Sequence, residues 1–164
     1  MKQANIQKHS KGFTYIELII IIIILGILGV AAFTRILHNL DPIKVRAAIE
    51  QITSDIEQTK GLSMARHDTI TLAFNLVTDS YSIYEGPTGS QTLLTDYPGS
   101  DNGVISFDRA EYSGVDISSA NFGGSTNLAF DQWGNTITGG TVTLNSNNII
   151  TIQTVSGQWT ISTP

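Results

Sequence analysis

The chain has 164 residues and no cysteine, and it carries 14 acidic against 9 basic side chains. Without cysteine, a structural disulfide, a thiolate nucleophile and a cysteine-based zinc site are excluded. Charge is uneven along the chain: residues 1–12 hold three lysines and no acid, whereas residues 69–164 hold eight acids and one base. Such an acidic surface disfavours binding to a nucleic-acid backbone.

Residues 1–12 are predicted to be a leader peptide. The segment is short, polar and basic, and its small residue Gly12 precedes the apolar run that follows. A secretory signal has its cleavage site after the apolar run. Cleavage after Gly12 would therefore remove the basic leader and leave the apolar segment attached. The lysines predict that the leader stays on the cytoplasmic side of a membrane.

Residues 13–33 are predicted to be a transmembrane helix. From Leu18 to Phe33 no side chain is charged or polar, and Glu17 is the one carboxylate at the start of this run. A helix of this length spans about 30 Å, which matches the hydrocarbon core of a bilayer. A buried helix of a soluble protein is the alternative, but the basic flank favours a membrane span.

Residues 34–68 are predicted to continue as an amphipathic helix. Val45, Ile49, Ile52 and Ile56 follow each other at helical spacing and form an apolar stripe. The other faces are expected to carry Lys44, Arg46, Glu50, Asp55 and Glu57. Asp41-Pro42 either starts a new helical segment or bends one long helix. Arg66-His67-Asp68 is expected to close the helix.

Residues 69–164 are predicted to form a β-rich globular head. From Thr69 onward apolar and polar residues alternate with a period of two, and the segments are separated by turn sequences. Turns are expected at residues 78–80 and 133–135, and residues 85–102 are expected to form a loop. Trp133, Trp159 and Ile161 are expected to pack in the core. The predicted strands are 70–76, 81–84, 104–107, 112–117, 127–130, 141–144, 149–154 and 158–161.

The motif Gly12-Phe13-Thr14-Tyr15-Ile16-Glu17-Leu18 closely resembles the class III signal of type IV prepilins and type II secretion pseudopilins. The resemblance implies that a prepilin peptidase cuts between Gly12 and Phe13 and that Phe13 becomes an N-methylated first residue. Many members of the family have proline where this chain has Thr34, and many major pilins have paired C-terminal cysteines that are missing here.

Further segments resemble the H-type minor pseudopilins and the related T-type minor pilins. They are residues 45–48, 63–66, 128–134, 140–144 and 156–161. The resemblance implies an α+β pilin-like fold, in which a long N-terminal helix packs on an antiparallel β-rich head. It also implies a structural subunit in the bacterial inner membrane, single-pass, with its C-terminal head in the periplasm.

The function expected from this resemblance is that of a minor pseudopilin at or near the tip of a type II secretion pseudopilus, where it helps to initiate assembly. A minor pilin of a type IV pilus, with a role in adhesion or DNA uptake, is the close alternative. The expected partners are other pseudopilins or pilins of the same filament, the prepilin peptidase, the inner-membrane assembly platform and membrane lipid. No nucleic acid is expected, because the head is acidic.

Glu17 is the predicted contact for subunit assembly. A carboxylate near the start of a membrane helix makes insertion into the bilayer unfavourable, unless it is protonated, reaches the headgroups or pairs with a cation. Cleavage after Gly12 would create such a cation, the Phe13 ammonium. The family resemblance implies that Glu17 pairs with this group on a neighbouring subunit. A Glu17 that only reaches the membrane interface is the alternative.

No arrangement of side chains predicts an enzyme, a cofactor or a metal site. His9, His38 and His67 are far apart in the chain, and Asp96–Asp101 lacks the spacing of an EF-hand loop. Asp108 and Glu111 form a carboxylate pair without a supporting base or nucleophile. A membrane-anchored enzyme or a lone anchored binding domain would be the alternatives to a filament subunit.

Overall fold

The computed structural model describes the backbone of residues 14–38 and 40–163 and the side chains of residues 14–28 and 42–163. It divides into two units, residues 1–40 and residues 41–164, which are described separately here. The predicted cleavage site, Gly12 and Phe13, lies outside the described residues. The proposed continuous helix is not confirmed, because residue 39 between the two helices is also outside them.

The first unit contains α1, Tyr15–His38. From Leu18 to Leu28 its side chains are apolar around the whole circumference, and almost all of them, including Ile22 and Ile27, are exposed. Among the residues that the structure describes, none of the helices combines the length and the hydropathy needed to cross a membrane.

All but the first residue of α2, Leu40–Arg66, belongs to the second unit, and the predicted apolar stripe of this helix is confirmed. Val45, Ile49, Ile52 and Ile56 are all buried. The buried face continues at the same helical spacing through Thr59 and Ser63, which are polar. The helix ends at Arg66, and His67 adopts a left-handed backbone with φ of 53°, a usual way to end a helix.

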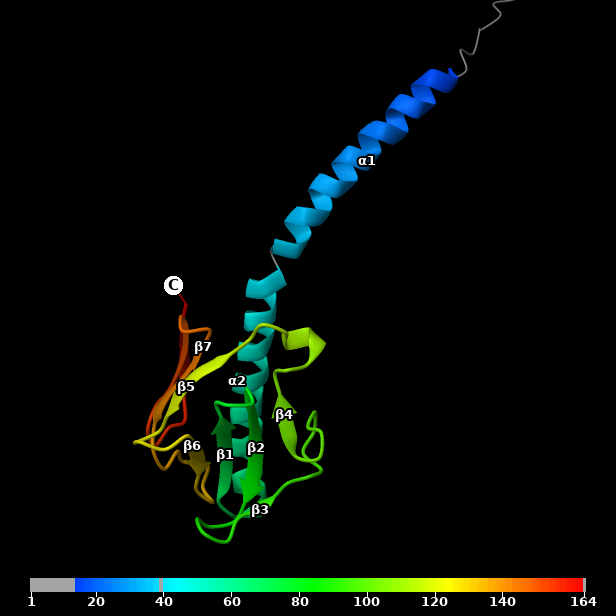
Figure 1. Cartoon of the computed structure of the whole chain (residues 1–164). Helices are drawn as coiled ribbons and strands as arrows, with labels where there is room; N and C mark the ends of the chain where they lie inside the picture. Colours follow the sequence, from blue (N-terminus) through cyan, green and yellow to red (C-terminus); the bar gives the residue numbers. More distant parts are fainter. Residues whose placement is uncertain (1–13, 39, 164) are drawn as a thin grey trace, which may run out of the picture. The chain divides into compact units, whose positions relative to one another are not determined.

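Two antiparallel sheets complete the second unit (Figure 1). The first sheet has the order β3-β2-β1-β6, with β4 also paired to β2, and the second has the order β5-β7-β8-β9. The strands of the first sheet are β1 Ile70–Asn75, β2 Ser80–Glu85, β3 Thr92–Leu93, β4 Val104–Ser106 and β6 Asn127–Phe130. Those of the second are β5 Ile117–Asn121, β7 Gly140–Leu144, β8 Asn148–Ile152 and β9 Trp159–Ser162.

The core of this unit lies between α2 and the two sheets. Figure 1 shows α2 running along β1 and β2, and Leu72 opposite Ile83 marks the register of the central hairpin. The α+β class, with a helix on antiparallel sheets, is thereby confirmed. The largest fully buried side chains are Tyr81, Phe107, Phe130, Ile52, Ile56, Ile70, Leu72, Ile83, Ile117, Leu128, Leu144 and Ile150.

The strand predicted over residues 112–117 is wrong except for its last residue. Ala110–Tyr112 forms a short 3-10 helix, and the chain reaches β5 only at Ile117. Two turn hydrogen bonds, from Tyr112 N to Arg109 O and from Val115 N to Tyr112 O, curl this segment. In this curled segment the ring of Tyr112 stands edge-on to Phe107, with centroids 5.0 Å apart.

Two expectations about single side chains, Trp133 and Asp55, are also wrong, and two others, Trp159 and Ile161, are met only in part. Trp133 is 65% exposed instead of buried. Ile161 lies opposite the buried Ile150, and therefore on the core side of the sheet, but it is 43% exposed on the last strand of that sheet. Trp159 is only partly buried against the core. Asp55, expected on a solvated helix face, is 2% exposed. It falls three residues after Ile52 and one before Ile56, so it belongs to the buried stripe.

Candidate assembly surfaces

Glu17 lies in the first turn of α1, and a local hydrogen bond fixes that turn. The backbone N–H of Glu17 donates to Thr14 Oγ1 at 3.3 Å, so that Thr14 acts as the N-cap of the helix. Threonine followed three residues later by glutamate is the capping-box pattern. The sequence reasoning on Glu17 had missed this signal, although it can be read directly from residues 14–17.

The Glu17 side chain is exposed, and no ion pair of the described residues includes it. Phe13, its predicted intermolecular partner, lies outside the described residues. The position is favourable for a carboxylate in any case, because the N-terminal end of a helix carries partial positive charge. The pairing of Glu17 with the Phe13 amine therefore stays a prediction.

The described part of α1 presents an exposed apolar surface. The consecutive residues Ile22, Ile23 and Ile24, which point in directions about 100° apart around the helix, are each at least half exposed. A helix that is apolar on all sides is stable only when lipid or protein surrounds it. The described part of α1 is thus suited to a nonpolar environment, and from Leu18 to Leu28 it has no polar side chain.

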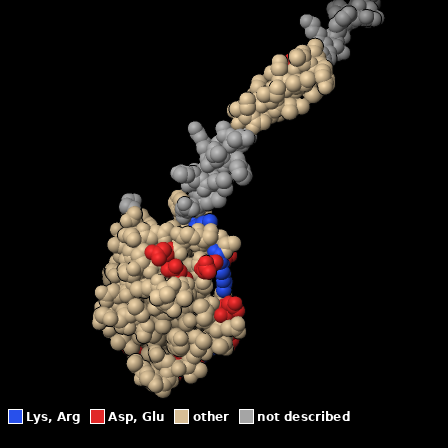
Figure 2. All heavy atoms as spheres, viewed as in Figure 1, with Lys and Arg blue, Asp and Glu red and all other residues tan. Residues whose placement is uncertain are grey.

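Polar contacts fasten α2 to the head along its length. Near its start Lys44 Nζ donates to Ser113 Oγ at 2.6 Å, and farther on Lys60 Nζ donates to the Ser156 carbonyl at 2.8 Å. Trp159 Nε1 donates to Glu57 Oε1 at 3.0 Å, and the last residue, Arg66, forms an ion pair with Glu85. Figure 2 shows acidic and basic side chains near one another on the visible face of the head.

A buried carboxylate ties the helix to the first sheet. Asp55 Oδ2 accepts hydrogen bonds from Tyr81 Oη at 2.5 Å and from Gln51 Nε2 at 3.0 Å, while Asp55 Oδ1 accepts one from Tyr97 Oη at 3.2 Å. Burial, and then the nearby Asp55 carboxylate, raise the pKa of both tyrosines above the ordinary value. We call Asp55, Tyr81 and Tyr97 the Asp55 cluster. Its hydrogen bonds join α2 to β2 and to the loop that contains Tyr97.

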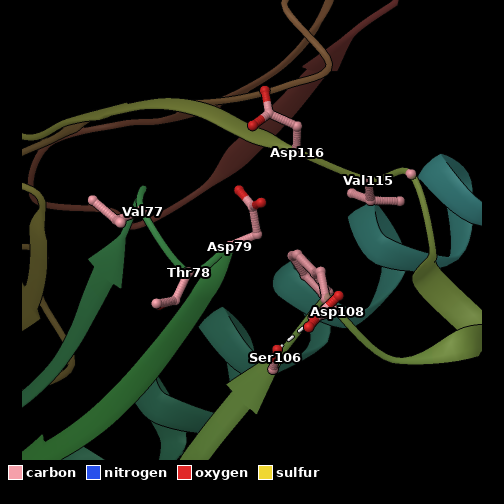
Figure 3. A pocket seen from close by; sticks show the side chains of 9 residues that line it. Val77, Thr78, Asp79, Ser106, Asp108, Val115 and Asp116 are labelled. Atoms are coloured by element: carbon pink, nitrogen blue, oxygen red, sulfur yellow. Dashed lines mark hydrogen bonds between the residues drawn. The ribbon is translucent and has the colours of Figure 1, made fainter.

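A cavity of about 630 Å³ opens at the surface between three segments, residues 77–79, 106–108 and 114–116. Figure 3 shows the carboxylates of Asp79, Asp108 and Asp116 on these three segments. Two of these carboxylates accept hydrogen bonds from neighbouring groups. Asp79 Oδ1 accepts one from the Ile117 N–H at 2.9 Å, and Asp116 Oδ2 accepts one from the Ser118 hydroxyl at 2.6 Å. These bonds order the turns around the cavity.

The described residues contain no group of three or more histidine, aspartate or glutamate side chains arranged to hold a metal ion. His67 packs edge-on against Trp133, whereas His9 and the side chain of His38 lie outside the described residues. In the loop considered for calcium, Asp101 accepts a hydrogen bond from Asn102 Nδ2. Glu111, the partner proposed for Asp108, is exposed in the short 3-10 helix.

Comparison with known proteins gave one result. The sequence model of the family described as type II transport protein GspH matches residues 48–163. The matched region begins within α2 and includes both sheets. Neither the curated proteins nor the solved structures compared with the chain gave a match.

Proposed function

Because the chain belongs to the GspH family of type II transport proteins, which are minor pseudopilins, we propose that it lies at or near the tip of a pseudopilus and helps to initiate assembly there. The observation that carries this proposal is the family match over residues 48–163. The role is structural, as a filament subunit for protein transport and not as an enzyme. Association with other pseudopilins of the type II secretion system follows from the family.

We further propose that the subunit starts in the inner membrane. Residues 1–12 would be removed by the prepilin peptidase, Phe13 would be N-methylated, and residues 13–33 would hold the protein in the membrane with the head in the periplasm. The basic leader, the uninterrupted apolar run and the exposed apolar surface of α1 support this arrangement. The inner-membrane assembly platform would then meet a subunit already anchored in lipid.

In the filament, Glu17 would pair with the Phe13 ammonium of a neighbouring subunit. Each addition would neutralise a carboxylate that is costly in lipid, which favours transfer of the subunit from membrane to filament. The exposure of Glu17 in the first turn of α1 supports this role. The alternative assembly, a type IV pilus, shares the N-terminal segment and the resemblance to minor pilins, but the family match over residues 48–163 favours the type II secretion pseudopilus.

The test compares Glu17→Gln with Glu50→Gln, an equally conservative change at an exposed glutamate of α2. Both variants are expressed in full with the other pseudopilins, and the membranes are solubilised for co-purification. We expect Glu17→Gln to keep the cleaved, methylated N-terminus, as measured by mass spectrometry, but to recover much less partner subunit than Glu50→Gln. Equal recovery by the two variants would refute the pairing.

A further inference from the structure

The turn that follows β6 holds a tryptophan outside the core. Asp131 Oδ1 accepts the backbone N–H groups of Trp133 and Asn135, both at 2.9 Å, and Asp131 Oδ2 accepts Asn135 Nδ2 at 3.1 Å. Two backbone hydrogen bonds between Asp131 and residues 134 and 135 close the turn. The backbone around Trp133 is therefore strongly determined, although its side chain is 65% exposed.

Two residues near the C-terminal end of α2, Met64 and His67, lie beside this turn. The ring of His67 stands edge-on to Trp133, with centroids 5.8 Å apart. Met64, itself 45% exposed, lies so close to the turn that a Cβ on Gly134 would be 2.9 Å from its Cγ. Gly134 also has φ of 78°, a conformation that favours glycine. We call Met64, His67 and Trp133 the Trp133 patch.

Such a patch is suited to protein contact. Tryptophan is among the residues that contribute most to binding free energy at interfaces. A side chain on a fixed turn loses little conformational entropy when a partner covers it. A thioether next to an aromatic ring also adapts to irregular apolar surfaces. The patch therefore has the composition of an interface anchor and not that of a solvated turn.

The charges around the patch indicate the chemistry of the partner. Among the described residues, no basic side chain lies within ion-pairing distance of Asp131 or Asp68. The nearby cations are already engaged, Lys60 with the Ser156 carbonyl and Arg66 with Glu85. The whole unit from residue 41 to 164 has five basic and thirteen acidic side chains, a balance of −8. A second copy would be repelled, and a basic surface would be attracted.

We propose that the Trp133 patch anchors this chain to a different subunit of the filament, one that offers an apolar pocket bordered by arginine or lysine side chains. The proposal rests on the proposed function, because it names a contact of the same filament. A guanidinium of the partner would stack on the exposed indole face and pair with the Asp131 carboxylate. The patch lies at the end of α2 opposite Leu40, where the N-terminal segment joins, about 40 Å away along the helix.

The experiment uses the full chain, co-expressed with the other pseudopilins of its own secretion system and recovered from solubilised membranes. Trp133→Ser is compared with Val77→Ser, which removes an apolar side chain that is 91% exposed in the turn between β1 and β2. We expect Trp133→Ser to reduce the recovery of one of the other pseudopilins about tenfold or more. Val77→Ser is expected to leave that recovery unchanged. Added salt should weaken the same contact.

A photo-reactive residue at position 133 should crosslink to that subunit and not to a second copy. Near-normal recovery by Trp133→Ser, or crosslinking only between copies of this chain, would overturn the proposal while leaving the proposed function intact. If the unsubstituted chain recovers none of the other pseudopilins, the proposed function and this inference fail together. Circular dichroism of each variant checks that the head remains folded, and Trp133→Phe provides a second, milder variant that should restore part of the recovery.

Discussion

The Asp55 cluster should be a major contributor to the stability of the head. Changing Tyr81 to phenylalanine removes one hydroxyl and leaves the ring in place in the core. It deprives Asp55 Oδ2 of a donor at 2.5 Å, in a position where the carboxylate is 2% exposed and water cannot substitute. A hydrogen bond to a carboxylate contributes about 1.5–3 kcal/mol, and we expect Tyr81→Phe to lower the free energy of unfolding by that amount.

A double-mutant cycle separates this hydrogen bond from other effects of the substitution. In an Asp55→Ala background the Tyr81 hydroxyl has lost its acceptor, so that removing it should cost less than about 0.5 kcal/mol. Tyr84→Phe is the control on the same strand, because Tyr84 makes no hydrogen bond to the cluster and is expected to change stability by less than about 0.5 kcal/mol.

The assay is denaturant unfolding of residues 41–164, followed by circular dichroism. This range contains every residue of the described core, from Val45 to Ile152. If Tyr81→Phe costs the same with and without Asp55, the hydroxyl stabilises the head by some route other than the carboxylate. If both costs are near zero, burial of this carboxylate does not depend on the tyrosine at all.

Two further predictions concern pH and glycine positions. Because the folded-state pKa of Tyr81 and of Tyr97 is raised, their neutral forms stabilise the head fully below the ordinary tyrosine pKa of about 10, and this stability is lost as the pH rises above it. Above about pH 10 the free energy of unfolding should fall by about 1.4 kcal/mol per pH unit for each of them. An unchanged slope in Tyr97→Phe would contradict this. Gly140→Ala should lower the free energy of unfolding by about 1–3 kcal/mol, because its Cβ would lie 2.0 Å from the backbone oxygen of Asn121. Gly61→Ala should raise it by about 0.5–1 kcal/mol, since that helical position is open, and thermal unfolding that ranks the two glycines the other way would refute the comparison.

The strands were predictable where one face is buried. Ile70, Leu72 and Phe74 alternate with less apolar residues, and all three are buried as the period of two requires. The arrangement of strands was less accessible. β6 pairs with β1 although about fifty residues separate them, and the division into two sheets depends on such nonlocal pairings. Local periodicity carries no information about which distant strand is the neighbour.

In α2, too, the local sequence does not identify the distant residues that decide which side chains are buried. Val45 to Ile56 could be read as a buried stripe from hydrophobicity alone, but the stripe continues through Thr59 and Ser63, both 0% exposed. Asp55 fits the helical spacing of the buried face, yet its negative charge predicted that the side chain is exposed to solvent. Its burial depends on Tyr81 and Tyr97, which come from strands and loops much later in the chain. A buried polar residue is recognisable only when its partners are known.

Trp133 shows how two local signals can be weighed against each other. The general preference of tryptophan for the interior indicated a core position, whereas Asp131, Gly134 and Asn135 indicated a turn. The turn prevailed, because Asp131 satisfies backbone N–H groups that a buried loop would leave without partners. Within this turn the Trp133 side chain is 65% exposed. A tryptophan within a strong turn sequence is therefore better read as a surface contact, and here that reading leads to the same residue as the proposed interface.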